Sequence, residues 1–209
     1  REESAHAVAV AKEAGIKTVM ITGDHLDTAR AIAERIGILY GDKKVMNGSE
    51  LRAISDEQLA AVIGDYRVFA RTSPEDKIRI VKAFRAAGEV VAMTGDGVND
   101  APALKAADVG IAMGSGTDVA KEAADMILLD DNFATIVTAV EEGRRVYSNI
   151  RKSLYSMLGC NFSALTIVLF SLIFGWGSPV TALQLLIIKV ACDGIPVSAS
   201  ASKKPIPIL

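Results

Sequence analysis

Short apolar runs alternate with amphipathic helical patterns through residues 1–132. This alternation is typical of a parallel β-sheet whose strands are joined by crossover helices. Five apolar runs have the length of strands: Thr18–Ile21, Arg67–Ala70, Val90–Thr94, Val109–Met113 and Met126–Leu129. The first part of the chain is therefore predicted to be an α/β domain.

Helix boundaries in this part are marked by capping residues and glycines. Three expected helices have a polar cap at their start: Ser55, Ser73 and Asp131. Ser55 forms a capping-box pattern with Gln58, Ser73 is followed by Pro74, and Asp131 precedes a helix expected from about Phe133. Three glycines lie where helices should stop: Gly15, Gly37 and Gly88.

The charge pattern changes after Lys152. Residues 154–174 contain no charged side chain, and a bilayer is crossed by about 20 apolar residues. A second apolar run, 180–201, is interrupted only by Lys189 and Asp193. Basic residues flank the pair on its outer sides, which favours a cytoplasmic location for both outer ends. We predict a transmembrane helical hairpin at 154–209 in contact with membrane lipid; two buried helices of a soluble protein are the alternative.

The segment before the hairpin is also helical in pattern. No proline interrupts the chain from Phe133 to Phe174, so one helix of about 63 Å is expected there. Residues 133–153 are therefore predicted to form a cytoplasmic helical stalk between the α/β domain and the membrane.

Composition narrows the class of protein. The chain has 209 residues, 50% of them hydrophobic, and a formal net charge of −2, which excludes disorder. The balanced charge also argues against a nucleic-acid partner. Two cysteines cannot form a disulfide framework, so the fold must be stabilised by a core or by lipid.

Polar loops follow two of the expected strands, at residues 22–24 (TGD) and 94–100 (TGDGVND). The carboxyl ends of parallel strands are where open α/β sheets bind ligands. Glycines let backbone amides approach a phosphate, and the carboxylates of Asp96 and Asp100 are oxygen ligands that Mg²⁺ prefers. The sequence predicts one phosphate and magnesium site, although a single Thr-Gly-Asp is by itself typical of a turn.

Lys77 follows Ser73 by four residues, so it is expected in the first turn of its helix. Its ammonium and the positive end of the helix dipole would both favour an anion. A solvated surface lysine is the alternative.

Five segments together resemble the phosphorylation domain of P-type cation-transporting ATPases, which has a haloacid dehalogenase-like fold. They are residues 20–25 (MITGDH), 70–77 (ARTSPEDK), 93–104 (MTGDGVNDAPAL), 109–114 (VGIAMG) and 130–133 (DDNF). The hairpin resembles the fifth and sixth transmembrane helices of that family. Within it, the soluble part is most similar to the calcium and sodium/potassium pump branch.

The resemblance implies a role for each matching residue. Asp96 would bind Mg²⁺, supported by Asn99 and Asp100. Thr22 and Gly23 would contact the phosphoryl group, whose charge Lys77 would neutralise. Two residues would lie near the ATP: Asp24 and Arg71. Such a site suits phosphoryl transfer, which depends on positioning and electrostatic stabilisation.

The family attacks ATP with an aspartate in an Asp-Lys-Thr-Gly-Thr motif, which does not occur in these 209 residues. We therefore expect a fragment of an ATP-driven cation pump whose nucleophile and nucleotide domain lie in a missing amino-terminal part, and we expect it to be inactive alone. The alternatives are a soluble haloacid dehalogenase-like phosphatase and a non-catalytic pump remnant.

The second apolar run carries ionisable groups, which are functional by default within a membrane. Lys189 and Asp193 are four residues apart and can pair on one helical face. Pro196 should interrupt that helix and free carbonyls for a cation site. A neutralised pair near the helix end is the structural alternative.

The calcium-pump pattern implies that Asn161 and Asp193 bind the transported cation. Two further positions depart from that pattern, with Ala164 in place of a glutamate and Lys189 in place of an asparagine. Losing a carboxylate and gaining an ammonium would leave a calcium ion poorly compensated. We therefore expect Lys189 to replace one transported ion, which would lower the stoichiometry or make a proton the substrate.

Overall fold

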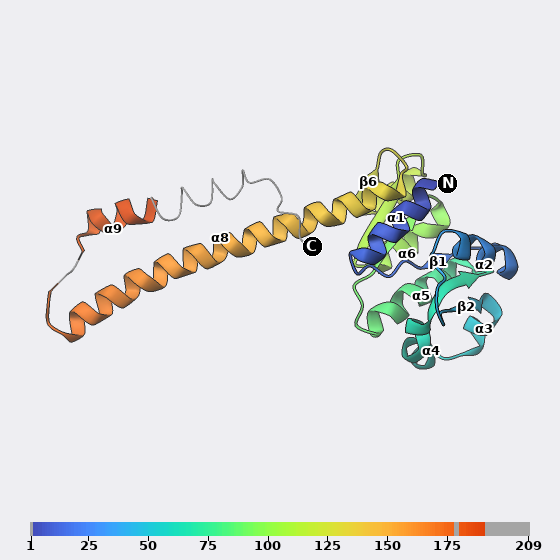
Figure 1. Cartoon of the computed structure of the whole chain (residues 1–209), viewed down its shortest axis with the longest axis horizontal. Coiled ribbons are helices and arrows are strands. Elements are labelled where there is room, and N and C mark those ends of the chain that lie inside the picture. The colour runs from blue at the N-terminus through green and yellow to red at the C-terminus, as the bar shows by residue number, and fades with distance from the viewer. Residues whose placement is uncertain (1, 178–179, 191–209) are drawn as a thin grey trace. The chain divides into compact units, whose positions relative to one another are not determined.

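The computed structural model describes residues 2–177 and 180–190, and the chain forms two units that divide between Thr138 and Ala139 (Figure 1). The first unit contains both β-sheets and the helices up to residue 123. The second is helical.

The first unit contains two parallel sheets of three strands each, with strand orders β1-β3-β2 and β4-β5-β6. The strands are β1 (Met20–Ile21), β2 (Lys44–Asn47), β3 (Tyr66–Ala70), β4 (Ala92–Gly95), β5 (Val109–Met113) and β6 (Met126–Leu128). The register pairs Ile21 with Phe69 in the first sheet and Thr94 with Ile111 in the second. All five expected strands are present, so the predicted parallel α/β fold is confirmed.

Strand β2 was not predicted from the sequence. It contributes only two apolar residues, Val45 and Met46, between two lysines and an asparagine. Met46 is nevertheless buried in the core, and β2 is an outer strand of its sheet. A run this short carries too little periodicity to separate a strand from a loop.

Helices connect the strands and cover the sheets: α1 (Glu2–Glu13), α2 (Leu26–Arg35), α3 (Gly48–Ala53), α4 (Asp56–Val62), α5 (Pro74–Ala86), α6 (Ala101–Ala106) and α7 (Asp118–Ala123). Two 3-10 turns lie at Ile63–Asp65 and Val98–Asp100. Ser55 and Ser73 cap α4 and α5, as predicted, and the capping box predicted for Ser55 with Gln58 is present. Ser73 also forms a capping box, with Asp76, which was not predicted. The three predicted stop glycines, Gly15, Gly37 and Gly88, have φ values of +77°, +81° and +85°.

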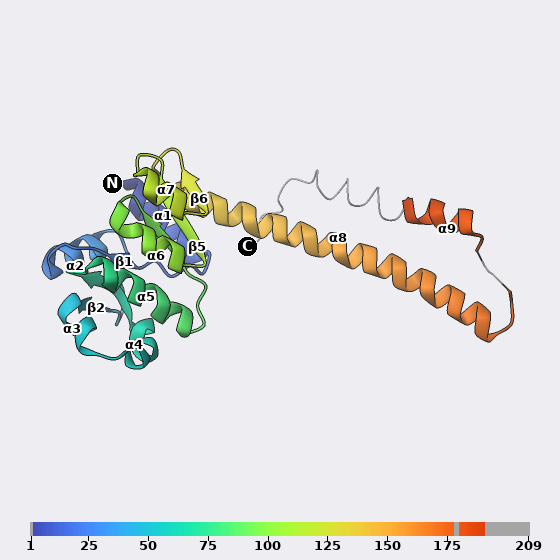
Figure 2. The ribbon, with the colours of Figure 1, turned by 180° about the vertical axis from the view of Figure 1, so that it is seen from behind.

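Helix α5 packs against the cores of both sheets. Its Ile80 and Phe84 belong to the cluster that contains Phe69 of β3, and its Val81 belongs to the cluster that contains Met93 of β4. Figure 2 shows α5, α6 and α7 side by side on one face of the first unit. Helix α5 therefore packs against a strand of each sheet.

The predicted cap of the long helix is corrected by the structure. Helix α8 (Phe133–Ile173) is preceded by Asn132, whose Oδ1 accepts the amide of Ala134 at 2.9 Å. Asp131, expected to cap, has φ +51° and its Oδ1 accepts the amide of Ser115 at 3.1 Å. The left-handed backbone turns its carboxylate away from the helix, which the sequence pattern could not indicate.

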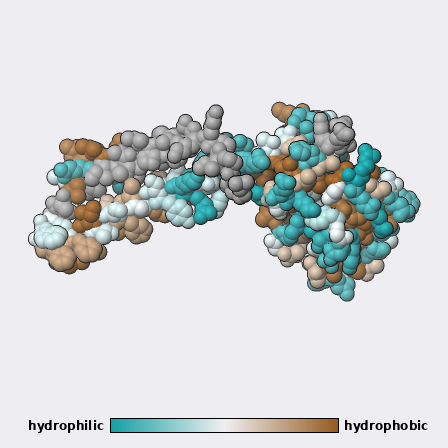
Figure 3. Space-filling model, viewed as in Figure 1, coloured by the Kyte–Doolittle hydropathy of each residue, from teal (hydrophilic) through white to brown (hydrophobic). Residues whose placement is uncertain are grey.

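Helix α8 is 41 residues long and unbroken, as the absence of proline predicted. It includes an 18-residue window with a mean hydropathy of 1.8, of which 6% is buried, so it is long and apolar enough to cross a membrane. Figure 3 shows hydrophobic residues on the surface at the end of α8. A short helix, α9 (Ala182–Lys189), begins the second predicted span, whose remainder lies outside the described residues. The hairpin therefore stays a prediction.

Candidate active site

The loops that follow β1 and β3 are joined at the carboxyl edge of the first sheet. Both the amide and the hydroxyl of Thr72 donate to the Thr22 carbonyl, at 3.2 and 3.1 Å. The Arg71 amide donates to the Asp24 carbonyl at 3.0 Å. The Thr-Gly-Asp loop is therefore hydrogen-bonded to the segment that leads into α5.

The Thr-Gly-Asp loop is itself ordered by its threonine. Thr22 Oγ1 accepts the Asp24 amide at 3.1 Å, which closes a hydroxyl turn. Gly23 is exposed, and a Cβ at this position would meet nothing within 4 Å. Backbone atoms at Gly23 are thus open to a ligand approaching the strand end.

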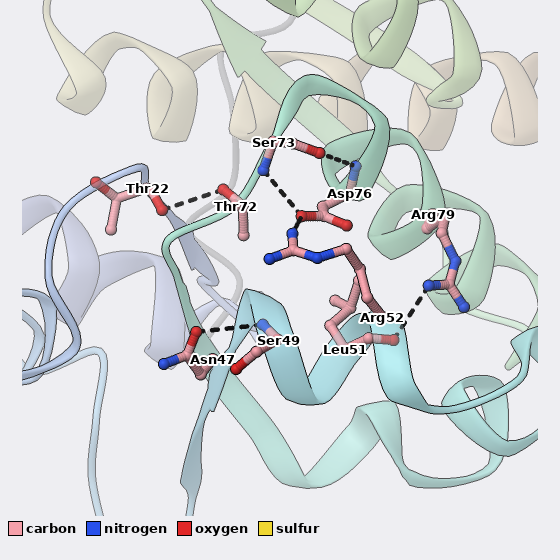
Figure 4. A network of polar contacts seen from close by, with 9 residues as sticks. All are labelled: Thr22, Asn47, Ser49, Leu51, Arg52, Thr72, Ser73, Asp76 and Arg79. Carbon is pink, nitrogen blue, oxygen red and sulfur yellow. Dashed lines mark hydrogen bonds and ion pairs between the residues drawn. The ribbon is translucent and has the colours of Figure 1, made fainter.

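The N-terminus of α5 is fixed by a buried carboxylate that sequence reasoning missed. Asp76 is 2% exposed, its Oδ2 accepts the Ser73 amide at 2.9 Å, and it pairs with Arg52 from α3 (Figure 4). Arg79 donates to the carbonyl of Leu51 at 3.1 Å, which holds α3 against the same helix (Figure 4). The capping-box spacing from Ser73 to Asp76 was the available signal, but its arginine partner is 24 residues away in the sequence.

Lys77 lies directly after that buried carboxylate and reaches the second sheet. Its Nζ is 2.6 Å from Asp100 Oδ1, and their side chains are 21% and 9% exposed. The other carboxylate oxygen of Asp100 accepts the amides of Asp96 and Gly97 at 3.3 and 3.2 Å. Asp100 therefore orders the acidic loop after β4 and ties it to α5.

Gly95 is required by this arrangement. A Cβ at Gly95 would lie 2.5 Å from the Cβ of Asp100, a distance that side chains do not tolerate. The glycine thus lets Asp100 fold back over its own loop.

Asp96 and Asn99, by contrast, are exposed. Within residues 2–177 and 180–190, the Asp96 carboxylate makes no hydrogen bond or ion pair, and no group of three metal-ligating side chains is present. One or two carboxylates suffice for Mg²⁺ when phosphate and water complete its shell. The Asp96 carboxylate, in the loop that Lys77 and Asp100 hold in position, fits such an ion.

The two residues expected near the nucleotide also lie together. Asp24 and Arg71 are joined through their backbones, and the Arg71 guanidinium contacts the ring of His25. Arg71 has φ +52°, an uncommon and strained value for a non-glycine residue. The contact with His25 was not foreseen from the sequence.

In the second unit, the structure brings together two of the three candidate residues for the transported ion. Lys189 of α9 donates to Asn161 Oδ1 of α8. The third residue, Asp193, lies outside the described residues, as does the predicted pairing of Lys189 with Asp193.

Comparisons with known proteins agree with the fold and the motifs. A family model described as haloacid dehalogenase-like hydrolase matches residues 1–108, and a second of the same description matches residues 78–140. A calcium-transporting ATPase of Bacillus cereus is 53% identical over 94% of this chain and 22% of its own length. The human calcium-transporting ATPase type 2C member 2 is 49% identical over 91% of this chain and 20% of its own length.

A solved structure is similar over both units. A zinc-transporting PIB-type ATPase in the E2.Pi state superposes with a TM-score of 0.71 at 30% identity, over 96% of this chain and 27% of that one. The chain thus spans about a quarter or less of the relatives that it matches. It belongs to the haloacid dehalogenase-like hydrolase family and is homologous to the P-type cation-transporting ATPases.

Proposed function

We propose that this chain supplies the phosphate-binding and magnesium-binding half of the phosphorylation domain of an ATP-driven cation pump, together with part of its ion path. The carrying observation is the Lys77–Asp100 pair, which joins the α5 N-terminus to the acidic loop after β4. Pumps of this kind form and hydrolyse an aspartyl phosphate to drive transport.

We infer a role for each group from its position in the fold. The Gly23 amide and the Thr22 hydroxyl hold phosphoryl oxygens at the end of β1. The positive charge of Lys77 neutralises the same oxygens. Asp100 and Asn99 keep the acidic loop after β4 in position. Asp96 binds Mg²⁺, which when present neutralises phosphate charge. The Asp24 and Arg71 pair borders the nucleotide.

The reacting aspartate belongs to a motif that these 209 residues lack. The purified chain should therefore neither release phosphate from ATP nor form an acid-stable phosphoenzyme. We would measure both with γ-labelled ATP. Steady phosphate release that Asp96→Asn abolishes would refute the assignment of this chain as a half-site.

Two other functions are separable from a pump. A soluble haloacid dehalogenase-like phosphatase would not need α8, whose apolar window is 6% buried. Partition of the purified chain into the aqueous phase of a detergent phase separation would favour the phosphatase. A non-catalytic remnant would be indicated if the coding sequence upstream of Arg1 lacks an Asp-Lys-Thr-Gly-Thr motif.

The proposed topology places residues 1–132 and the stalk 133–153 in the cytoplasm and residues 154–209 in the membrane. Its support is the position of the basic residues on both sides of the apolar runs. Protease digestion of sealed inside-out vesicles should remove the first unit and protect the hairpin. Protection of the first unit would reverse the orientation.

For the cation, we propose that Lys189 acts as a fixed positive charge in the transport site. The support is its hydrogen bond to Asn161, the residue otherwise expected to face the ion. We would replace the matching segment of the Bacillus cereus calcium-transporting ATPase with this chain and compare Lys189 with Lys189→Asn. The asparagine variant should raise the number of ions moved per ATP; an unchanged stoichiometry and selectivity would contradict the proposal.

A further inference from the structure

One loop is hydrogen-bonded both to the acidic loop after β4 and to Asp131, two residues before the start of α8. It comprises residues 114–117, between β5 and α7, and we name it the 114–117 loop. The Thr117 amide donates to the Asp96 carbonyl at 2.8 Å, and the Ser115 amide donates to Asp131 Oδ1 at 3.1 Å. Thr117 therefore binds the backbone of Asp96, and Ser115 binds Asp131, the residue that precedes the α8 cap.

The two glycines of this loop pack closely against the backbones of Asp96 and Leu128. A Cβ at Gly116 would lie 2.9 Å from the Asp96 carbonyl oxygen, and a Cβ at Gly114 would lie 2.8 Å from the Leu128 carbonyl oxygen. The Gly114 amide donates to that same Leu128 oxygen at 2.7 Å. A loop packed this tightly on both sides has little freedom to absorb a displacement at one end.

On these contacts we propose that Asp131 is a positioning residue for Asp96, acting through the 114–117 loop, so that the metal-binding loop and the first turn of α8 move together. The inference rests on the proposed function only for the role of Asp96. Hydrogen bonds from Ser115 lower the pKa of Asp131, so its carboxylate is ionised at neutral pH and accepts the Ser115 amide strongly.

Asp131 offers a clean pair of substitutions because its φ is +51°. Asp131→Gly removes the acceptor and leaves a residue that adopts this backbone without strain. Asp131→Asn keeps an acceptor oxygen and also tolerates the left-handed region. A difference between the two variants therefore reports the acceptor rather than the backbone.

The neighbouring Asp125 provides the matched control. It is also exposed and its Oδ2 accepts a backbone amide, that of Gly110 at 2.8 Å, but the bond lies at the start of β5. Asp125→Ala therefore removes an equivalent bond away from the 114–117 loop.

The test is amide hydrogen exchange by NMR on the full 209-residue chain in detergent micelles, without ligand. Asp131→Gly should speed exchange at Ser115 and at Thr117 by about tenfold, the effect of losing one charge-assisted hydrogen bond. Asp131→Asn keeps a neutral acceptor, so it should raise both rates by no more than about threefold. Asp125→Ala should speed Gly110 but not Thr117. An unchanged Thr117 rate in Asp131→Gly, or a Thr117 rate raised equally by Asp125→Ala, overturns the proposal.

A second arm adds Mg²⁺ with inorganic phosphate and follows the amide shifts of residues 95–100. Asp131→Gly should weaken the apparent magnesium affinity about threefold or more, and Asp131→Asn should restore it. Equal affinity in the parent and in Asp131→Gly overturns the positioning role. If Mg²⁺ shifts none of these amides in the parent chain, the metal site of the proposed function is refuted, while the ligand-free exchange rates still decide the role of Asp131.

Discussion

Lys77 and Asp100 form an ion pair of 2.6 Å between two elements that are 23 residues apart in the sequence. The pair joins the first turn of α5 to the loop after β4, and both side chains are largely shielded from water. An isolated carboxylate in such a position would be costly, so the lysine and the two loop amides together stabilise it. The same ammonium is the one that we propose neutralises the phosphate.

Replacing Lys77 should reveal this dependence. Lys77→Ala leaves Asp100 buried without its cation and should lower the free energy of unfolding by about 2 kcal/mol. The measurement is urea unfolding followed by circular dichroism. Lys82→Ala, which alters an exposed lysine on the same helix, is the control and should change little. Adding Asp100→Asn to Lys77→Ala should recover part of the loss, and full additivity of the two changes would contradict the pairing.

Removing Arg52 tests the buried carboxylate at the α5 N-terminus. Arg52→Ala should destabilise the first unit by about 1–3 kcal/mol, because Asp76 is 2% exposed and would keep only its bonds to Ser73. The lower part of that range applies because Arg52 is itself half-exposed. Thermal unfolding measures the change, with exposed Arg35→Ala as control. A stability equal to that of the control would show that the ion pair contributes nothing.

A methyl group at Gly95 should disrupt the acidic loop. Gly95→Ala places a Cβ 2.5 Å from that of Asp100, so the carboxylate must move and release the Asp96 and Gly97 amides. We expect a loss of about 1–3 kcal/mol and faster exchange at both amides. Gly64→Ala, where a Cβ would meet nothing within 4 Å, is the matched control. Unchanged amide exchange in Gly95→Ala would mean that Asp100 does not order the loop.

Acid should loosen the start of α8. The Thr135 hydroxyl, and after it the Asn132 amide, lower the pKa of Asp130 below its ordinary value of 3.8, and bonds from Ser115 lower the pKa of Asp131 from the same value. Groups with a lowered folded-state pKa stabilise the fold fully above the ordinary value, and that contribution is lost as the pH falls through the lowered one. Carboxyl carbon shifts in a pH titration measure both groups.

The two carboxylates can be separated in this titration. Thr135→Val should return the pKa of Asp130 toward 3.8 and leave the pKa of Asp131 unchanged. Ser115→Ala should raise only the pKa of Asp131. If either substitution shifts both carboxylates equally, a shared field rather than local hydrogen bonds sets these pKa values.

Local patterns predicted much of the fold because they act over a few residues. The strand Val109–Met113 and the cap at Ser73 were predicted from apolar runs and capping spacing, and both are present. Strand β2 was missed because Val45 and Met46 carry too little pattern. Asp131 was misassigned because its backbone has a positive φ and its carboxylate accepts the Ser115 amide instead of capping α8.

The residue types of the site could be predicted from the sequence, but the contacts between them could not. Glycine and carboxylate content marked the loop at Asp96, yet nothing local connects Arg52 to Asp76. Such pairings depend on how α3 and α5 pack, which is a property of the assembled core. The roles of the site residues remain predictions that the experiments above address.

Helix α5 carries Val81 on one side and Phe84 on another, each within a different apolar cluster. Unfolding of α5 would therefore expose the apolar clusters of both three-stranded sheets. The two three-stranded sheets should unfold in one transition. A destabilising substitution on the Phe84 side of α5, far from the acidic loop, should therefore lower the magnesium affinity at the second sheet.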